Sequence, residues 1–77
     1  MTSNGQLNAR RSSVKRVLRR QDSGQYLMEG GWTEEIDEAL DFDDSFEAVE
    51  ICVRLGLKDI DLVLRVPSGD IFCTPLR

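Results

Sequence analysis

The segment between Asp44 and Leu57 constrains the fold most, because it carries both a start signal and a stop signal for a helix. Asp44 is a good N-cap residue, and Glu47 follows three positions later in a capping-box pattern. At the other end, Gly56 can adopt the left-handed conformation of a C′ residue, and Leu57 can pack back onto the last turn. The pattern predicts a helix over about residues 45–55.

This predicted helix is apolar around most of its circumference. Its polar stripe is formed by Glu47, Glu50 and Arg54. The other positions are mostly apolar: Phe46, Ala48, Val49, Ile51, Cys52, Val53 and Leu55. A helix with such a broad apolar arc is expected to be covered on much of its surface.

The residues after the helix have the pattern of a β-hairpin. Residues 60–66 alternate between apolar and polar, which places Ile60 and every second residue after it on one face. Pro67 to Asp70 has turn composition, and residues 71–74 resume as a strand. Pro75 ends that strand, and because proline cannot donate to a ladder it suits an edge or a terminus.

The residues before the helix predict a second hairpin. Residues 13–21 have some helical spacing, but a turn containing Gly24 follows and residues 26–28 resume an apolar run, so we favour two strands. Residues 29–32 are a second turn signal. Thr33 is a fair N-cap for one or two helical turns over residues 34–40.

The order strand, strand, helical turn, helix, strand, strand predicts an α+β fold. We expect two layers, with one main helix packed on a small, mostly antiparallel sheet in a ββ-α-ββ arrangement. Residues 1–12 have few apolar groups and are expected to be a disordered basic tail, which leaves residues 13–77 as one domain. In a domain this small, every large apolar side chain is expected to be structural, and a homodimer would add burial.

The net charge of −4 conceals an uneven distribution along the chain. Residues 1–21 contain six basic and no acidic residues, whereas residues 22–77 contain four basic and fourteen acidic residues. The simplest interpretation is that the basic and the acidic residues form two solvated faces, whose charges partly neutralise one another. Alternatively, the basic residues contact nucleic acid phosphates, and the candidates are Arg10, Arg11, Lys15, Arg16, Arg19 and Arg20.

The acidic part of the chain suggests a surface for a protein partner. Nine carboxylates occur in the seventeen positions from Glu34 to Glu50, without a basic residue among them. Trp32 precedes them and is either an interaction anchor or a structural side chain of the small core. The candidate partner surface consists of Trp32, Glu34, Glu35, Asp37 and Glu38.

Enzyme, metal and cofactor sites are not predicted. The chain has no histidine, the commonest general base and metal ligand. It lacks a GxGxxG or P-loop motif, so no cofactor is expected. Cys52 and Cys73 are far apart without a CxxC motif, and we interpret both as buried free thiols. Since no apolar run approaches the ~18 residues of a membrane helix, we expect a cytoplasmic protein.

Several short motifs resemble those of small uncharacterised proteins encoded by bacteria and phages. Those proteins share the layout YL…GWT…A..F…EA…LGL…LVLR, which here falls within residues 14–66. The matching segments are Tyr26-Leu27, Gly31-Trp32-Thr33, Ala39 to Phe42, Glu47-Ala48, Leu55-Gly56-Leu57 and Leu62 to Arg65. The resemblance implies a compact α+β fold and, because those proteins have no assigned activity, it implies no site residue.

These observations together favour a non-enzymatic protein-interaction module. The contact would use either the acidic surface or an exposed sheet edge. An accessory nucleic-acid-binding protein that uses the basic N-terminal residues is the alternative.

Overall fold

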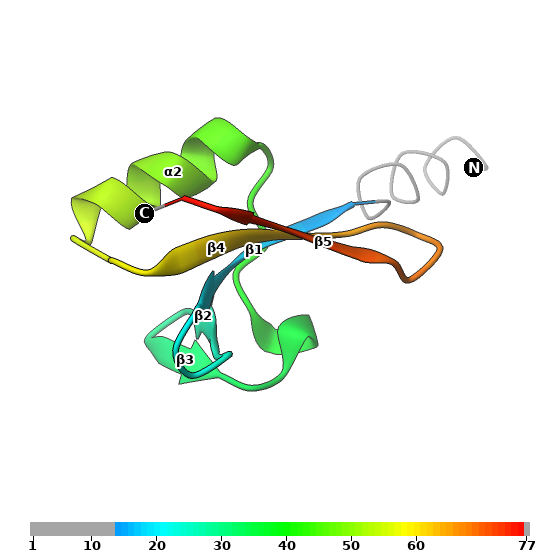
Figure 1. Cartoon of the computed structure of the whole chain (residues 1–77), viewed down its shortest axis with the longest axis horizontal. Coiled ribbons are helices and arrows are strands. Elements are labelled where there is room, and N and C mark those ends of the chain that lie inside the picture. The colour runs from blue at the N-terminus through cyan, green and yellow to red at the C-terminus, as the bar shows by residue number, and fades with distance from the viewer. Residues whose placement is uncertain (1–13, 77) are drawn as a thin grey trace, which may run out of the picture.

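A computed structural model describes residues 14–76, which form one antiparallel five-stranded sheet and one α-helix (Figure 1). The strand order in the sheet is β3-β2-β1-β4-β5. The strands are β1 (Lys15–Arg20), β2 (Tyr26–Met28), β3 (Gly31–Thr33), β4 (Ile60–Arg65) and β5 (Ile71–Pro75). A 3₁₀ turn, η1 (Ile36–Glu38), and the helix α2 (Ser45–Arg54) lie between β3 and β4. The predicted α+β class is confirmed; the predicted tail lies outside the described residues.

Strand β1 is the central strand of the sheet. It pairs with β4 over its whole length, from Lys15 opposite Arg65 to Arg20 opposite Ile60, and with β2 through Arg19 opposite Tyr26. Both predicted hairpins are therefore present, and the two are joined through the β1–β4 pairing. The side chains of Val17 and Leu18 are fully buried on opposite faces of β1 because both faces are covered.

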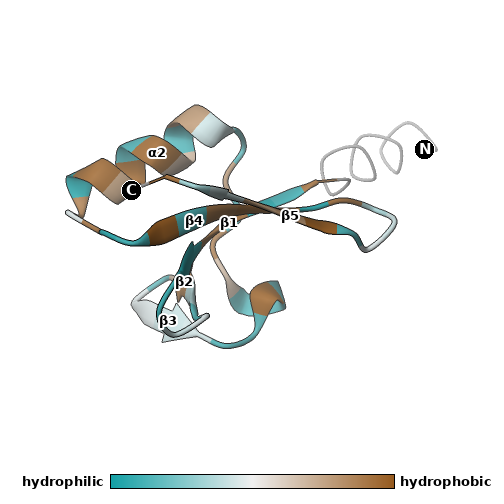
Figure 2. Cartoon of the chain, viewed as in Figure 1, coloured by the Kyte–Doolittle hydropathy of each residue, from teal (hydrophilic) through white to brown (hydrophobic). Residues whose placement is uncertain are grey.

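The core lies mainly between α2 and the sheet. Ala48 and Cys52 of the helix pack there with residues of β1, β2 and β4, and the buried members are Leu18, Leu27, Phe42, Ala48, Cys52, Ile60 and Leu62. A smaller cluster on the opposite face contains Val17, Ala39 and Val63, with Ile36 of η1 packed against it. In Figure 2, much of β4 has the colour of hydrophobic residues and lies beneath the helix.

The predicted order lacked one strand. Residues 29–32 were expected to form a turn, and residues 34–40 a helical turn, but Gly31–Thr33 form β3 and η1 covers Ile36–Glu38. The turn is limited to Glu29 and Gly30, whose φ of 86° suits glycine. Leu27 then pairs with Trp32, which gives the short strand a buried neighbour.

The structure uses the capping signals at both ends of α2, although the Glu47 carboxylate accepts from the Asp43 backbone N–H, at 3.1 Å, where a capping box would use that of Asp44. The Asp44 carboxylate accepts a hydrogen bond from the Glu47 backbone N–H at 2.8 Å. At the other end, the Gly56 N–H donates to the Val53 carbonyl and the Leu57 N–H donates to the Cys52 carbonyl, each at 3.0 Å. These two bonds make a Schellman motif, with Gly56 at a φ of 67°.

We expect Gly56→Ala to lower the free energy of unfolding by about 1 kcal/mol, because an L-residue disfavours the left-handed conformation. No atom lies within 4 Å of the position that the new Cβ would occupy, so the cost comes from the backbone alone. Urea unfolding followed by circular dichroism measures the change. Gly31→Ala is the matched control, because Gly31 has the same open surroundings without a positive φ. Equal effects of the two substitutions would contradict this account.

The prediction that α2 is covered on much of its circumference is wrong. Ala48 and Cys52 are its buried residues, and Ile51 is half-buried. The helix rests on one face of the sheet, and no other described element covers its remaining sides. The apolar side chains that stay exposed near or on α2 are Phe46, Val49, Val53 and Leu55.

Candidate protein-interaction surface

Strand β5 forms a free edge of the sheet. It pairs with β4 on one side, and within residues 14–76 no strand pairs with its other side. All five of its residues are exposed. The other edge of the sheet, β3, has three residues, so β5 is the longer exposed edge. Unpaired N–H and C=O groups of such an edge are a template for another strand.

The pairing with β4 determines which backbone groups of β5 face outward. The Leu76 N–H donates to the Ile60 carbonyl and the Val66 N–H donates to the Asp70 carbonyl, so even-numbered residues bond toward β4. Ile71, Cys73 and Pro75 therefore point their backbone groups away from the sheet. Pro75 has no N–H to offer there, which explains how proline is accommodated in the strand.

Phe46, Val49 and Val53 are exposed apolar residues at neighbouring positions on α2. Their spacings of three and four residues place them above one another on the helix. Val49 and Val53 each follow one of the two buried residues, Ala48 and Cys52, by one position. Val49 and Val53 therefore lie beside the buried side of the helix, whereas Phe46, two positions before Ala48 and so about 200° around the helix from it, points away from the sheet.

The chirality of the chain places Val49 and Val53 on the same side as β5. Ile60 and Leu62 point their side chains toward α2 and their backbone groups toward β5. Consider the sheet viewed from the helix with β4 running upward. In a strand of L-residues, the backbone N–H and C=O groups of the residues whose side chains point toward the viewer are directed to the right, so β5 lies to the right of β4. Figure 1 shows α2 running opposite to β4. In a right-handed helix with that direction, the step from Ala48 to Val49 turns toward β5.

Strand β5 contributes an apolar side chain next to the flank of α2 that carries Val49 and Val53. Phe72 lies opposite Leu64 in the ladder, so its side chain is on the face of the sheet that carries α2. It is 56% exposed, and Phe46 on the helix is 77% exposed. We call Val49, Val53 and Phe72 the edge strip, since all three are exposed apolar residues of β5 or of the flank of α2 that faces it, whereas Ile71, opposite Arg65 in the ladder, is exposed on the other face of the sheet.

The four described basic candidates lie on the central strand β1 and contact the rest of the domain. Lys15 Nζ donates to the Asp37 carbonyl at 3.4 Å, and an Arg16 guanidinium N–H donates to the Asp43 carbonyl at 3.0 Å. Arg19 forms an ion pair with Asp61, and the Arg20 guanidinium lies 4.4 Å from the centre of the Trp32 ring. Arg10 and Arg11 lie outside the described residues.

Arg19 is half-buried on β1. Its guanidinium and the Gln21 amide both donate to the Asp61 carboxylate, at 3.4 and 2.9 Å. Burial alone lowers the pKa of Arg19, but the electrostatic influence of Cys73, hydrogen bonding to Tyr26 and the Asp61 carboxylate raise it, and the net shift is upward. Arg19 is therefore a structural charge on the sheet face opposite α2.

The two cysteines differ in their surroundings. Cys52 is buried on the side of α2 that faces the sheet, as predicted, and its Sγ lies 3.8 Å from the Leu57 carbonyl oxygen. Cys73 is exposed on β5, so the prediction of two buried thiols is wrong for Cys73. The reason is its position on the edge strand, on the face opposite α2, where the described elements leave it uncovered. Neither described cysteine forms a disulfide.

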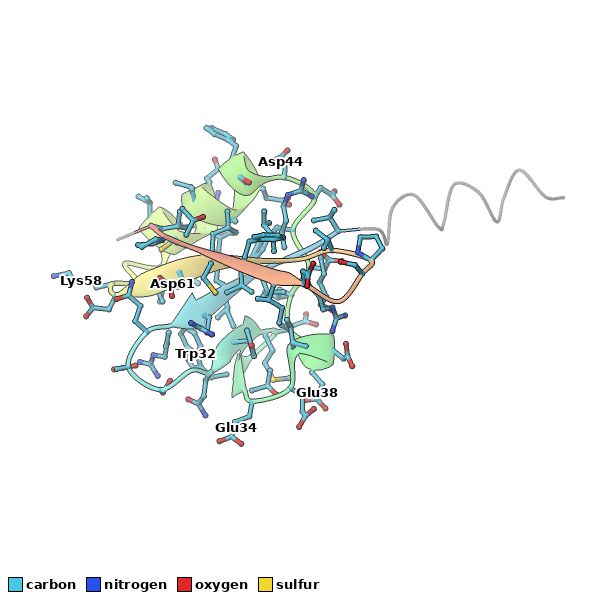
Figure 3. All side chains as sticks on the ribbon, turned by 45° about the vertical axis from the view of Figure 1, so that its right-hand side comes forward. Trp32, Glu34, Glu38, Asp44, Lys58 and Asp61 are labelled. Carbon is cyan, nitrogen blue, oxygen red and sulfur yellow. The ribbon has the colours of Figure 1, made fainter. Side chains whose placement is uncertain are left out.

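The acidic segment from Glu34 to Glu50 is divided between the two sides of the sheet. Figure 3 shows Glu34 and Glu38 at one end of the molecule and Asp44, at the start of α2, at the other. The Asp37 carboxylate pairs with Arg65 at 2.9 Å, and Glu38 accepts a hydrogen bond from the Thr33 hydroxyl at 2.8 Å. Glu34 and Glu35 are exposed. The chain therefore uses part of its acidic segment to hold η1 in place.

Trp32 is half-buried and packs against the main core from β3. The Arg20 guanidinium lies over its ring and forms a cation–π contact. Both contacts are within the domain and support the structural interpretation of this residue.

Sequence reasoning identified the edge position of β5 but not the edge strip. Pro75 gave the signal for the edge. The exposure of Phe46, Val49 and Val53 had no local signal, because the same apolar spacing also fits a covered helix.

Comparisons of the chain with protein-family models, with curated proteins and with solved structures found no match. No helix in the described part of the chain is long and apolar enough to cross a membrane. Within residues 14–76, no three acidic or cysteine side chains gather in a way that could hold a metal ion. The argument for function therefore rests on the surface of the domain.

Proposed function

We propose that this protein is a protein-interaction module that binds an extended segment of a partner along β5. The added segment would hydrogen-bond to the outward N–H and C=O groups of the edge strand, the mode called β-augmentation. Its side chains on the helix face would contact Phe72 and the exposed flank of α2. The exposure of all five β5 residues beside this apolar flank is the observation that carries the proposal.

The edge strip supports this proposal better than the acidic segment does. Exposed apolar side chains that gather on one surface are typical of interaction sites. The acidic side chains, in contrast, are spread over both sides of the sheet, and Asp37 already has an ion-pair partner. A basic partner bound through Glu34 and Glu35 is the alternative within the same class of function.

Nucleic-acid binding by the basic residues is the weaker alternative. Phosphate contacts need basic side chains that are free to reach the backbone of a nucleic acid. Lys15, Arg16 and Arg19 already contact carbonyl or carboxylate oxygens of this chain. The many carboxylates of residues 22–77 would also repel a duplex within a Debye length of ~8–10 Å.

Partner capture with matched variants tests the proposal. We expect immobilised wild-type protein to retain partners from a native extract, and Phe72→Glu to lose them because a charge would enter the apolar strip. The control is the double variant Glu34→Lys/Glu35→Lys, which changes the acidic side chains and leaves β5 intact. Retained proteins are identified by mass spectrometry.

The two variants separate the alternatives. Loss of partners in Phe72→Glu alone supports the edge. Loss in the double lysine variant alone would shift the contact to the acidic surface, and equal retention by all three proteins would contradict the proposal. Circular dichroism of each variant checks that the fold is intact.

A further inference from the structure

We infer that the strand that binds to β5 is the β5 strand of a second copy of this chain, giving a two-fold symmetric dimer. This inference rests on the proposed function, since it names the partner of the same edge. Two antiparallel β5 strands would continue the sheet from one copy into the other. The two-fold axis would then run perpendicular to the sheet, which brings both α2 helices to the same face.

The charge of the surface favours self-association at this edge over other places. Residues 22–77 carry fourteen acidic and four basic residues, so two copies repel each other over most of their surfaces. β5 is an exception, because residues 71–75 contain no charged side chain. Val49 and Val53 on the neighbouring flank of α2 are likewise uncharged. Two copies can approach through this strip without bringing carboxylates directly together.

The edge strip supplies part of the apolar area that a dimer interface needs. A phenylalanine side chain carries on the order of 200 Å², so Phe72, 56% exposed, leaves on the order of 110 Å² of apolar surface open. Val49 and Val53 add to this area. A standard interface buries about 800 Å² per partner, somewhat more than half of it apolar. The backbone of β5 supplies polar area.

The outward backbone groups of β5 determine the register of the pair. Ile71 and Cys73 present the outward N–H groups, since Pro75 has none. A register centred on Phe72 places Ile71 opposite Cys73 of the second copy, so each pair exchanges two hydrogen bonds and the outward groups of both residues are satisfied. A register centred on Cys73 would instead leave the Ile71 carbonyl facing the proline nitrogen.

The register centred on Phe72 also places the two Phe72 side chains together. They would form a pair that is not hydrogen-bonded, with Cα atoms about 4.5 Å apart, on the face that carries both helices. Aromatic pairs across strands are stabilising. The exposed flanks of the two α2 helices would stand on either side of this pair and cover it.

Sedimentation equilibrium of the 77-residue chain tests the dimer. We expect a mass twice the 8.7 kDa of the chain for the wild type. Phe72→Glu should raise the dissociation constant of the dimer at least about a hundredfold. Both copies carry the new charge next to the two-fold axis, and a tenfold increase in the dissociation constant corresponds to only 1.4 kcal/mol. Val53→Glu, on α2 and outside the sheet, should weaken the dimer in the same direction. A wild-type protein that stays monomeric at the highest concentrations measured would overturn the inference.

Disulfide trapping tests the register. In a Cys73→Ser background, Phe72→Cys should cross-link two copies under mild oxidation, because a Cα separation of about 4.5 Å suits a disulfide. Thr74→Cys in the same background is the control, since the two copies of residue 74 would lie several residues apart along the ladder. Equal cross-linking through both positions, or a dimer that Phe72→Glu leaves intact, would overturn the inference.

The outcome also separates this inference from the proposed function. A monomer that captures other proteins through Phe72 overturns the dimer and leaves the interaction module standing. Self-association and capture that are both insensitive to Phe72→Glu overturn the two together.

Discussion

Replacing Leu18 with alanine is expected to lower the free energy of unfolding by about 2–5 kcal/mol. Leu18 is fully buried on the central strand, between α2 and the sheet, and packs with residues of α2, β2 and β4. The smaller side chain loses contact with all of them and leaves a cavity. Because small domains are stable by only several kcal/mol, a measurable fraction of the variant should be unfolded at room temperature.

Leu55→Ala is the matched control for this prediction. The chemical change is the same, but Leu55 is 56% exposed at the end of α2. We expect its effect to stay within about 1 kcal/mol, since surface substitutions change stability little. Urea unfolding of both variants, followed by tryptophan fluorescence of Trp32, measures the difference. A loss at Leu18 no larger than the loss at Leu55 would show that the core is not where the structure puts it.

The elements that the sequence predicts well have local signals. The cap at Asp44 and the Gly56-Leu57 stop lie within the helix segment itself, so α2 is predicted to within one residue. Both hairpins have short turns, one with Gly24 and one after Pro67, next to alternating residues. Strand β3 is missed because its three residues depend on pairing with β2 and have no alternation of their own.

The candidate surface depends on arrangements that no local pattern specifies. A valine at position 49 or 53 would look the same in the sequence under a covering element as it does exposed beside β5. The basic residues give the opposite example. Lys15 to Arg20 suggest an arm for phosphates, but their strand is central, and the register of β1 on β4 brings Arg19 opposite Asp61. The order of the strands, and not composition, decides which charges are neutralised.

Asp61→Asn is expected to lower the free energy of unfolding by about 2 kcal/mol. The Asp61 side chain is 13% exposed and accepts hydrogen bonds from both Arg19 and Gln21. Without the carboxylate, the Arg19 guanidinium keeps its charge in a partly buried site. The Arg19 Nε already has no hydrogen-bond partner among the described residues. Losing the Asp61 carboxylate would therefore leave more of the guanidinium without a partner. Urea unfolding at neutral pH measures the change.

Asp37→Asn removes the carboxylate of the other ion pair and serves as the control. The pair between Asp37 and Arg65 is shorter, 2.9 Å against 3.4 Å, but the Asp37 side chain is 78% exposed. Water and salt screen such a pair, so we expect a loss of at most about 0.5–1 kcal/mol. Burial, and not the N–O distance, should therefore rank the two substitutions. A larger loss of unfolding free energy for Asp37→Asn than for Asp61→Asn would contradict this ranking. The exposed pair of Asp37 with Arg65 would then stabilise the fold more than the partly buried pair of Asp61 with Arg19.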